Sequence, residues 1–290
     1  MSPKLLTALS EAITKHTGSQ FQATSSKAQG GGCIHEAVIL SDGTTHYFVK
    51  LNRATNLHMF EAEAEALSVI ARTGTLRTPK PIAHGHCGES AYLILEALSF
   101  GTAHAESWQK MGQQLARLHR FSAEDFGWHR DNTIGATPQQ NTWTPDWPSF
   151  FREQRLLPQF KWTAQKGYAF KNAAKLLEQV EALLAGHAPA PSLLHGDLWS
   201  GNASFLNDGT PVIYDPAFYY GDRETDLAFS EFFGGFPTQF YNSYQSEWPT
   251  PPGYEKRKDL YNLYHVLNHA NLFGGSYVSQ AEQMIRGLLQ

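Results

Sequence analysis

The amino-acid pattern of this chain changes near residue 105, and that change limits the folds open to it. Before residue 105, short runs of β-forming residues follow a helical stretch, whereas afterwards the apolar spacing is mostly that of helices. A length of 290 residues also exceeds the usual size of one domain. We therefore expect an α+β chain with an N-terminal lobe over residues 1–98 and a larger, mainly helical lobe over residues 99–290.

The N-terminal lobe is predicted to be rich in β-structure. Residues 37–40 and 46–51 are short runs with β-formers, and the turn sequence between them predicts a hairpin. Residues 59–72 place apolar side chains on one face, which predicts a helix that Gly74 ends. Residues 91–98 resemble a buried strand.

The second lobe is predicted to be helical, with one β-rich island. Helical spacing covers residues 108–120, 148–160 and 171–184. The island consists of two short apolar runs, residues 192–194 and 211–214, on either side of a polar loop. Polar residues between short strands indicate a site held on rigid elements.

Composition excludes several classes of function. A formal net charge of -4, without a dense Lys/Arg run, gives no reason to expect nucleic-acid or membrane-surface binding. No apolar segment reaches the roughly 18 residues needed to span a bilayer, and the N-terminus lacks the features of a signal peptide. Two cysteines, Cys33 and Cys87, are too few for a disulfide framework. These observations predict a cytoplasmic protein.

The polar loop carries the residues best suited to chemistry. Residues 194–202 read LHGDLWSGN, in which Asp197 and Asn202 have the D-x-x-x-x-N spacing of a kinase catalytic loop, and Asp215 ends the next apolar run. Phosphoryl transfer from ATP needs a carboxylate that accepts the proton of the attacking hydroxyl, and oxygen ligands for Mg²⁺. The pattern predicts Asp197 as the base and Asn202 and Asp215 as the metal ligands; the alternative is that all three simply form turns.

Residues 195–202 resemble the signature of the fructosamine kinase (ketosamine 3-kinase) family, a branch of the aminoglycoside phosphotransferase and choline kinase group. Residues 215–228, 233–236 and 261–275 also resemble that family, and the likeness runs from about residue 30 to the C-terminus. The resemblance implies a protein-kinase-like bilobal fold, with a small β-rich N-lobe and ATP in the cleft. It also implies ATP-dependent phosphorylation of the sugar 3-hydroxyl of a ketosamine, the adduct of a sugar with an amine, which leads to deglycation.

Candidate nucleotide-binding residues lie in the N-terminal lobe in the expected order. Gly31 and Gly32, beside Cys33, precede the hairpin and would let backbone N–H groups approach phosphates. Lys50 ends a strand and resembles the lysine that pairs with the α- and β-phosphates. Glu96 falls where the hinge between the lobes is expected, so that the neighbouring backbone would bond the adenine.

The helix after Lys50 must supply the carboxylate that orients this lysine. Glu61, Glu63 and Glu65 compete for the role, and the resemblance favours Glu63. Cys33 raises a separate hypothesis: a thiol beside anion-favouring N–H groups could be prone to oxidation, which would give redox control through a disulfide-linked dimer. The alternative is an inert small residue in a monomer.

Two further residues are candidates for contact with the acceptor. Trp199 lies inside the loop, two residues after the proposed base, and could stack on a sugar or its linked amine, although a core aromatic is the ordinary alternative. His269 either lines the acceptor pocket or satisfies a core hydrogen bond. His265 precedes it by one helical turn, but Val266 stands where the zinc motif H-E-x-x-H needs glutamate.

Two other functions stay open on the sequence alone. One is a kinase for another small alcohol, such as choline, homoserine or an aminoglycoside. The other is a nucleotide-binding module without catalysis, which would have no need for the base Asp197. The sequence does not identify the sugar, the nature of the amine (free or on a protein lysine) or the oligomeric state.

Overall fold

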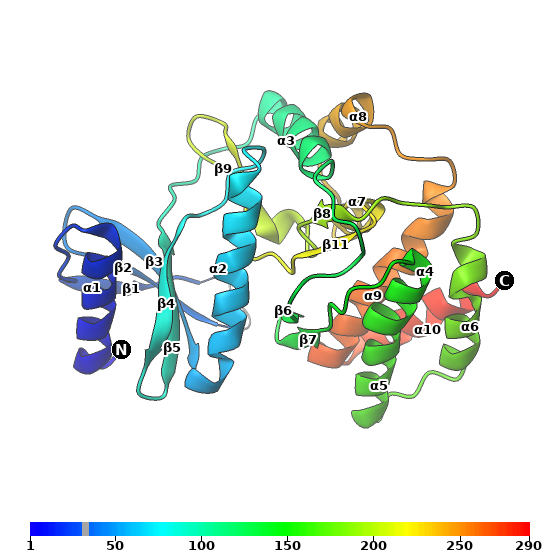
Figure 1. Cartoon of the computed structure of the whole chain (residues 1–290), viewed down its shortest axis with the longest axis horizontal. Helices are drawn as coiled ribbons and strands as arrows, with labels where there is room; N and C mark the ends of the chain where they lie inside the picture. Colours follow the sequence, from blue (N-terminus) through cyan, green and yellow to red (C-terminus); the bar gives the residue numbers. More distant parts are fainter. Residues whose placement is uncertain (31–34) are drawn as a thin grey trace. The chain divides into compact units, whose positions relative to one another are not determined.

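The computed structural model describes residues 1–30 and 35–290, and the chain divides into two compact units (Figure 1). Unit 1 comprises Met1–His104 and Ser204–Tyr214, and unit 2 comprises Ala105–Ala203 and Asp215–Gln290. Unit 1 holds a sheet and unit 2 is mainly helical, as predicted for an α+β chain. Within the described ranges, no helix is long and apolar enough to cross a membrane.

Unit 1 is built on a five-stranded antiparallel sheet with the strand order β1-β2-β3-β5-β4. Its strands are β1 (Ser25–Ala28), β2 (Glu36–Ser41), β3 (His46–Arg53), β4 (Pro81–Cys87) and β5 (Ser90–Glu96). Helices α1 (Pro3–Thr17) and α2 (Leu57–Arg72) cover opposite faces of this sheet (Figure 1), and a 3₁₀ turn, Ala54–Asn56, leads into α2. The predicted hairpin, helix and strand are therefore confirmed.

The alternation of side chains along β3 directs Lys50 towards α2. Successive side chains of a strand point to opposite faces of the sheet. Val49 and Leu51 are buried in the apolar cluster that includes residues of α1. Lys50 lies between them in sequence and pairs with a side chain of α2, Glu63. The register of the β2–β3 hairpin therefore decides which face carries the lysine.

A hairpin from the second half of the chain belongs to unit 1. It consists of β9 (Ala203–Phe205) and β10 (Pro211–Ile213). The Gly101 N–H donates to Phe205 O at 2.8 Å, and the Ile213 N–H donates to Arg77 O at 3.0 Å. The sequence-based boundary between residues 98 and 99 therefore differs from this division, in which unit 1 extends to His104 and includes residues 204–214. The hairpin is held in unit 1 by backbone hydrogen bonds to segments that are distant in sequence, and such bonds cannot be predicted from a local pattern of residues.

Unit 2 is organised around the long helix α9. The helices are α3 (Ala105–Leu118), α4 (Trp147–Phe150), α5 (Leu157–Gln165), α6 (Ala173–Leu183), α7 (Glu224–Phe232), α8 (Thr238–Glu247), α9 (Tyr254–Phe273) and α10 (Ser276–Leu288). Residues 260–268 of α9 are all buried, because α5, α7 and α10 pack around it. A helix that is buried on every side is a core element rather than a surface helix.

The helix predicted over residues 148–160 is interrupted. The segment Phe151–Leu156 is π-helical and separates α4 from α5. Pro158 has no N–H to donate to Gln154 O, and the Arg155 guanidinium donates to this carbonyl instead, at 3.0 Å. The apolar spacing predicted helix correctly, but it did not reveal the break.

Both strands predicted beside the polar loop are present, but they pair with other partners. β8 (Ser192–Leu194) pairs with β11 (Tyr219–Gly221), while β10 pairs with β9. A further hairpin joins β6 (Asn132–Ile134) to β7 (Thr137–Gln139).

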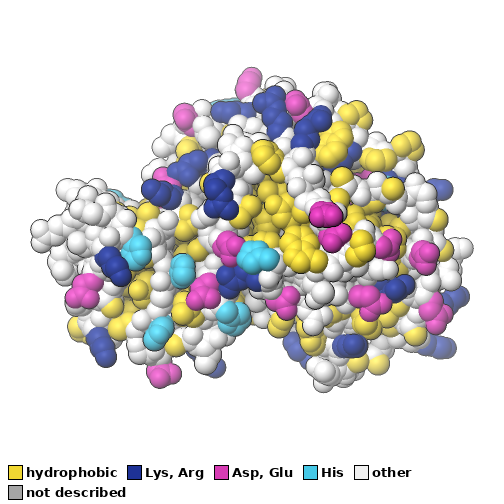
Figure 2. Space-filling model, viewed as in Figure 1, with side chains coloured by type: hydrophobic (Ala, Val, Ile, Leu, Met, Phe, Trp, Pro, Cys, Tyr) yellow, Lys and Arg dark blue, Asp and Glu magenta, His cyan; other side chains and the backbone are white. Residues whose placement is uncertain are grey.

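On the face drawn in Figure 2, basic and acidic side chains are interspersed, so this face carries no basic stripe of the kind that binds nucleic acid.

Candidate functional site

The loop between β8 and β9 is fastened to α7 by one carboxylate. Asp226 accepts hydrogen bonds from the N–H groups of His195 and Gly196, both at 2.8 Å. Gly196 has a φ of +81°, and a Cβ there would lie 2.0 Å from Ala217 O. Only glycine fits this position. Asp226 therefore holds the backbone at the start of this loop.

Asp197 and Asn202 meet at the two ends of this loop. The Nδ2 of Asn202 donates to Asp197 Oδ2 at 2.9 Å and to the Asp197 backbone O at 2.8 Å. The turn Ser200–Asn202 brings the amide back to the aspartate. Because both bonds use Nδ2, the amide oxygen of Asn202 faces away from Asp197 and is the atom that a cation could bind.

The electrostatic surroundings of Asp197 suit a proton acceptor. Its side chain is 20% exposed. Burial raises the pKa of Asp197 to about 7, although the hydrogen bond from Asn202 opposes the rise, and the negative charge of Asp215 contributes to it. A base whose pKa lies near the working pH is the kind that general-base catalysis uses.

Asp215, two residues after the end of β10, has an unusual backbone conformation. Its φ is +58°, and it is the one non-glycine residue with a positive φ in the described part of the chain. Such conformations cost free energy and gather at functional sites. The side chain is exposed, and its charge acts on Asp197. Asp215 and the amide oxygen of Asn202 are hard oxygen donors, so they fit Mg²⁺.

Trp199 belongs to a partly exposed row of aromatic rings. A Cβ on residue 201 would lie 2.3 Å from the indole of Trp199, so the ring can occupy this position only because residue 201 is glycine. The Trp199 ring centroid is 5.5 Å from that of Phe233, which is 5.3 Å from that of His269. Tyr277 lies 4.9 Å beyond His269, and Phe273, 56% exposed, also contacts His269. We call these side chains of Trp199, Phe233, His269, Phe273 and Tyr277 the aromatic surface.

Two of these residues were candidates from the sequence, and three were missed. The structure links Trp199 to His269 through Phe233. The i, i+4, i+8 spacing of residues 265, 269 and 273 could have indicated one helix face, but the sequence alone did not show what that face meets. Tyr277, on the following helix, carries no comparable signal.

Unit 1 contains the candidate phosphate-binding lysine. Lys50 Nζ lies 2.6 Å from Glu63 Oε1, and the two side chains are only 7% and 11% exposed. The structure thus brings Lys50 together with the favoured glutamate of the three candidates. The carboxylate supplies the partner that a nearly buried ammonium group needs.

Glu96 uses its side chain and its N–H within unit 1. The N–H donates to Lys80 O at 2.9 Å, and the carboxylate accepts from Lys80 N–H at 3.1 Å and from Arg77. Both groups of Glu96 are therefore engaged within unit 1. The predictions for Gly31, Gly32 and Cys33 fall on residues 31–34, outside the described residues.

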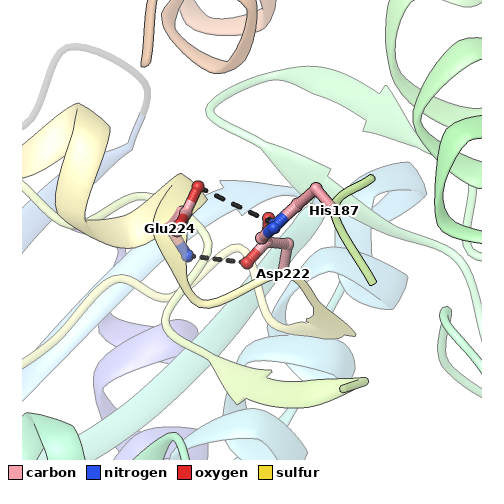
Figure 3. Close-up of side chains that lie close together, drawn as sticks. All are labelled: His187, Asp222 and Glu224. Carbon is pink, nitrogen blue, oxygen red and sulfur yellow. Dashed lines mark hydrogen bonds and ion pairs between the residues drawn. The ribbon is translucent and has the colours of Figure 1, made fainter. Parts of the chain in front are cut away.

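A second cluster of ionisable groups lies at the start of α7 (Figure 3). His187 Nε2 is 2.6 Å from Asp222 Oδ2 and 3.8 Å from Glu224 Oε2. Arg257 donates to both oxygens of Glu224 at 2.7 Å, and Tyr261 donates to Asp222 Oδ2 at 2.5 Å. The carboxylates are already compensated, so the cluster is an ion-pair network rather than a metal site.

The network combines a local cap with contacts between distant segments. Asp222 does cap locally, because it accepts from the Glu224 N–H at 3.0 Å. The other side-chain partners of Asp222 and Glu224 in this network are distant in sequence, however. Arg223 donates to the backbone O of Trp248 at 3.0 Å. The segment therefore joins several elements of unit 2.

Comparisons with known proteins show the family of this chain. Residues 5–290 match the sequence model of the fructosamine kinase family. A probable ketoamine kinase from Synechocystis is 49% identical over 290 residues, covering 100% of this chain and 98% of the relative. The crystal structure of a putative fructosamine-3-kinase from Haemophilus somnus is similar, with a TM-score of 0.92, 32% identity and 97% coverage of both chains.

A more distant neighbour shows the fold class. Spectinomycin phosphotransferase, solved with ADP and spectinomycin, has a TM-score of 0.61 and 15% identity, covering 100% of this chain and 96% of the other. The fold is therefore that of the protein-kinase-like phosphotransferases, as expected. Within that class, the chain belongs to the fructosamine kinase family.

Proposed function

We propose that this protein transfers the γ-phosphoryl group of ATP to the 3-hydroxyl of a ketosamine. The observation that carries the proposal is the Asp197–Asn202 pair, fastened to α7 through Asp226, in a chain of the fructosamine kinase family. Phosphoryl transfer needs mainly positioning and charge stabilisation, and these residues supply both.

Each residue has a distinct part in the proposed reaction. Asp197 orients the sugar hydroxyl and accepts its proton. Lys50, held by Glu63, binds the α- and β-phosphates. Asn202 and Asp215 would hold Mg²⁺, which supplies positive charge against the phosphate oxygens when bound.

The aromatic surface suits the acceptor. A ketosamine carries a sugar and a secondary amine that is protonated at neutral pH. Aromatic faces bind such cations through cation–π attraction, and they also stack on sugar rings. Trp199 is partly exposed and Phe273 is 56% exposed, so a ligand of this kind can reach both rings. A phosphate on the 3-hydroxyl makes the adduct labile, so the outcome would be deglycation.

Substrate identity can be tested by measuring ADP release with a panel of acceptors. Ribulosyl-, fructosyl- and erythrulosyl-lysine are compared with choline, homoserine and kanamycin, all with saturating MgATP. We expect turnover with at least one ketosamine and none with the other alcohols. Turnover confined to choline, homoserine or kanamycin would replace the proposed substrate class, and comparison of a free ketosamine with a glycated protein would identify the amine.

The role of Asp197 is tested by Asp197→Asn. Removal of a general base costs about 10²–10⁴-fold in kcat, and we expect this loss with little change in the Kd for MgATP. A variant that turns over at the wild-type rate would remove Asp197 from the mechanism.

A further inference from the structure

His265 is a buried side chain with one polar atom left unbonded. It lies in α9, is 4% exposed, and stacks on Phe229 with ring centroids 3.6 Å and planes 8° apart. Its Nδ1 is buried and has no hydrogen-bond partner among the described residues. Such atoms are rare because the lost hydrogen bond to water is not replaced. The Nδ1 atom therefore indicates a group that binds from outside the chain.

The unbonded nitrogen faces the proposed base. His265 Nδ1 lies 4.0 Å from Asp197 Oδ1, which is too far for a direct hydrogen bond. One oxygen atom at about 2.8 Å from each would bond to both. Asp197 Oδ2 already accepts from Asn202 Nδ2 at 2.9 Å. Oδ1 and Nδ1 thus form a pair of atoms that one hydroxyl group can join.

The surroundings of His265 favour the neutral ring. Burial lowers the pKa of His265 well below its ordinary value, and the positive charges of His269 and Arg155 lower it further. A neutral imidazole has one N–H, so it offers a hydrogen bond without competing with Asp197 for the proton of the hydroxyl.

We propose that the acceptor hydroxyl binds between Asp197 and His265, a step that rests on the phosphoryl transfer proposed above. The hydroxyl donates a hydrogen bond to Asp197 Oδ1 and accepts one from His265 Nδ1–H. Its proton passes to the carboxylate while its oxygen forms the bond to the γ-phosphorus, and the bond from that phosphorus to the leaving oxygen of ADP breaks. His265 keeps its proton and stabilises the charge that develops on the attacking oxygen.

Two substitutions separate this role from packing. His265→Phe keeps a flat ring against Phe229 and removes both nitrogens. His265→Asn places an amide near the position of Nδ1 and loses most of the ring. Asn262→Ala is the matched control, because Asn262 is also buried in α9 and its Oδ1 is likewise unbonded among the described residues.

The test is steady-state kinetics of the full chain with the ketosamine that the wild type phosphorylates best. For His265→Phe we expect kcat to fall about 10- to 100-fold, the size of one lost hydrogen bond to a developing charge. The KM for ATP and the slow hydrolysis of ATP by water should stay within twofold of the wild type. His265→Asn should recover at least fivefold of the lost kcat, and Asn262→Ala should keep at least half of it.

Three outcomes would overturn the inference. His265→Phe could retain more than half of the wild-type kcat, His265→Asn could fail to recover activity, or Asn262→Ala could lose as much as His265→Phe. If the wild type phosphorylates an alcohol other than a ketosamine, the substrate proposal fails. The same variants, assayed with that alcohol, then test His265 independently.

Discussion

The two units bury polar groups in very different ways. Among the described residues of unit 1, Lys50 is the one buried charged side chain, and its core is a sheet covered by apolar residues on both faces. Unit 2 buries six charged side chains and three histidines. Of the histidines, His119 and His195 are fully buried and His265 is nearly so. The charged side chains are Arg155, Asp222, Arg223, Glu224, Asp226 and Arg257.

This difference shows which unit depends on the exact placement of its buried side chains. Apolar cores tolerate rearrangement, whereas a buried charge is stable only when its partners are in place. In unit 2, Asp226 accepts from the loop between β8 and β9 and also lies 3.1 Å from His119 Nε2, while His119 Nδ1 is hydrogen-bonded to Tyr244 at 2.8 Å. The proposed base is thus positioned by a polar network, and we expect unit 2 to respond more strongly than unit 1 to changes of charge.

The largest expected effect is that of Asp226→Asn. The amide would place an NH₂ group against N–H donors and leave His119 without its carboxylate. Breaking a buried charged contact costs about 3–5 kcal/mol, so urea unfolding should show a loss of this size, together with most of the activity. Asp146→Asn, at the exposed N-cap of α4, is the control and should change stability by less than about 0.5 kcal/mol. Equal losses of stability in the two variants would mean that the buried contacts of Asp226 do not set the size of its effect.

A smaller effect is expected from acid. Burial lowers the pKa of His119, although Asp226 opposes this, and it lowers that of His265 further. At these two histidines the unfolded chain binds more protons than the folded one near and below pH 6.5, so their contribution to stability is lost as the pH falls. Asp197, whose pKa is raised to about 7, takes up a proton in the folded chain over the same range and opposes part of this loss. Between pH 7.5 and 5.5, a histidine that stays neutral in the folded chain costs about 1.4 kcal/mol, which we expect for His265, and the cost at His119 should be smaller because Asp226 opposes the effect of burial.

Tryptophan fluorescence can report this loss for unit 2, because all seven tryptophans lie within its residue ranges. Urea unfolding at the two pH values gives the free energies. His265→Phe removes one titrating group, so its loss of stability should be about 1.4 kcal/mol smaller than that of the wild type. An identical pH dependence in both proteins would mean that His265 is not kept neutral by burial.

The smallest effect on stability is expected in unit 1. The double variant Lys50→Met with Glu63→Leu replaces the ion pair by apolar groups of similar size, which is often nearly neutral. We expect a change within about 1 kcal/mol, but a large loss of ATP affinity, measured by calorimetry. Lys4→Met, at an exposed position, should change neither quantity. A double variant that binds ATP like the wild type would remove Lys50 from the nucleotide site.

The sequence predicted those parts of the molecule that have a local signal. The hairpin of β2 and β3, the helix α2 and the loop around Asp197 each have a periodicity or a motif that survives without tertiary context. The partners of the loop strands have no such signal, because three-residue strands such as β8 and β11 pair through tertiary packing.

The polar network of unit 2 was also beyond local reading. His187 bonds Asp222 across 35 residues, and Glu224 bonds Arg257 across 33. Nothing in the neighbouring sequence indicates which distant cation a buried carboxylate meets. The same holds for His265, whose nearness to Asp197 depends on how α9 packs against the loop.

The assignment of the β9–β10 hairpin to unit 1 affects how the protein can be dissected. The chain passes between the units at residues 104/105, 203/204 and 214/215, so no single cut separates them. Asn202 is the second-last residue of unit 2 before the 203/204 boundary, and Asp215 is the first residue of unit 2 after the 214/215 boundary. An expression fragment carrying unit 2 alone would therefore need an artificial linker in place of Ser204–Tyr214, at the very point where both proposed metal ligands are anchored.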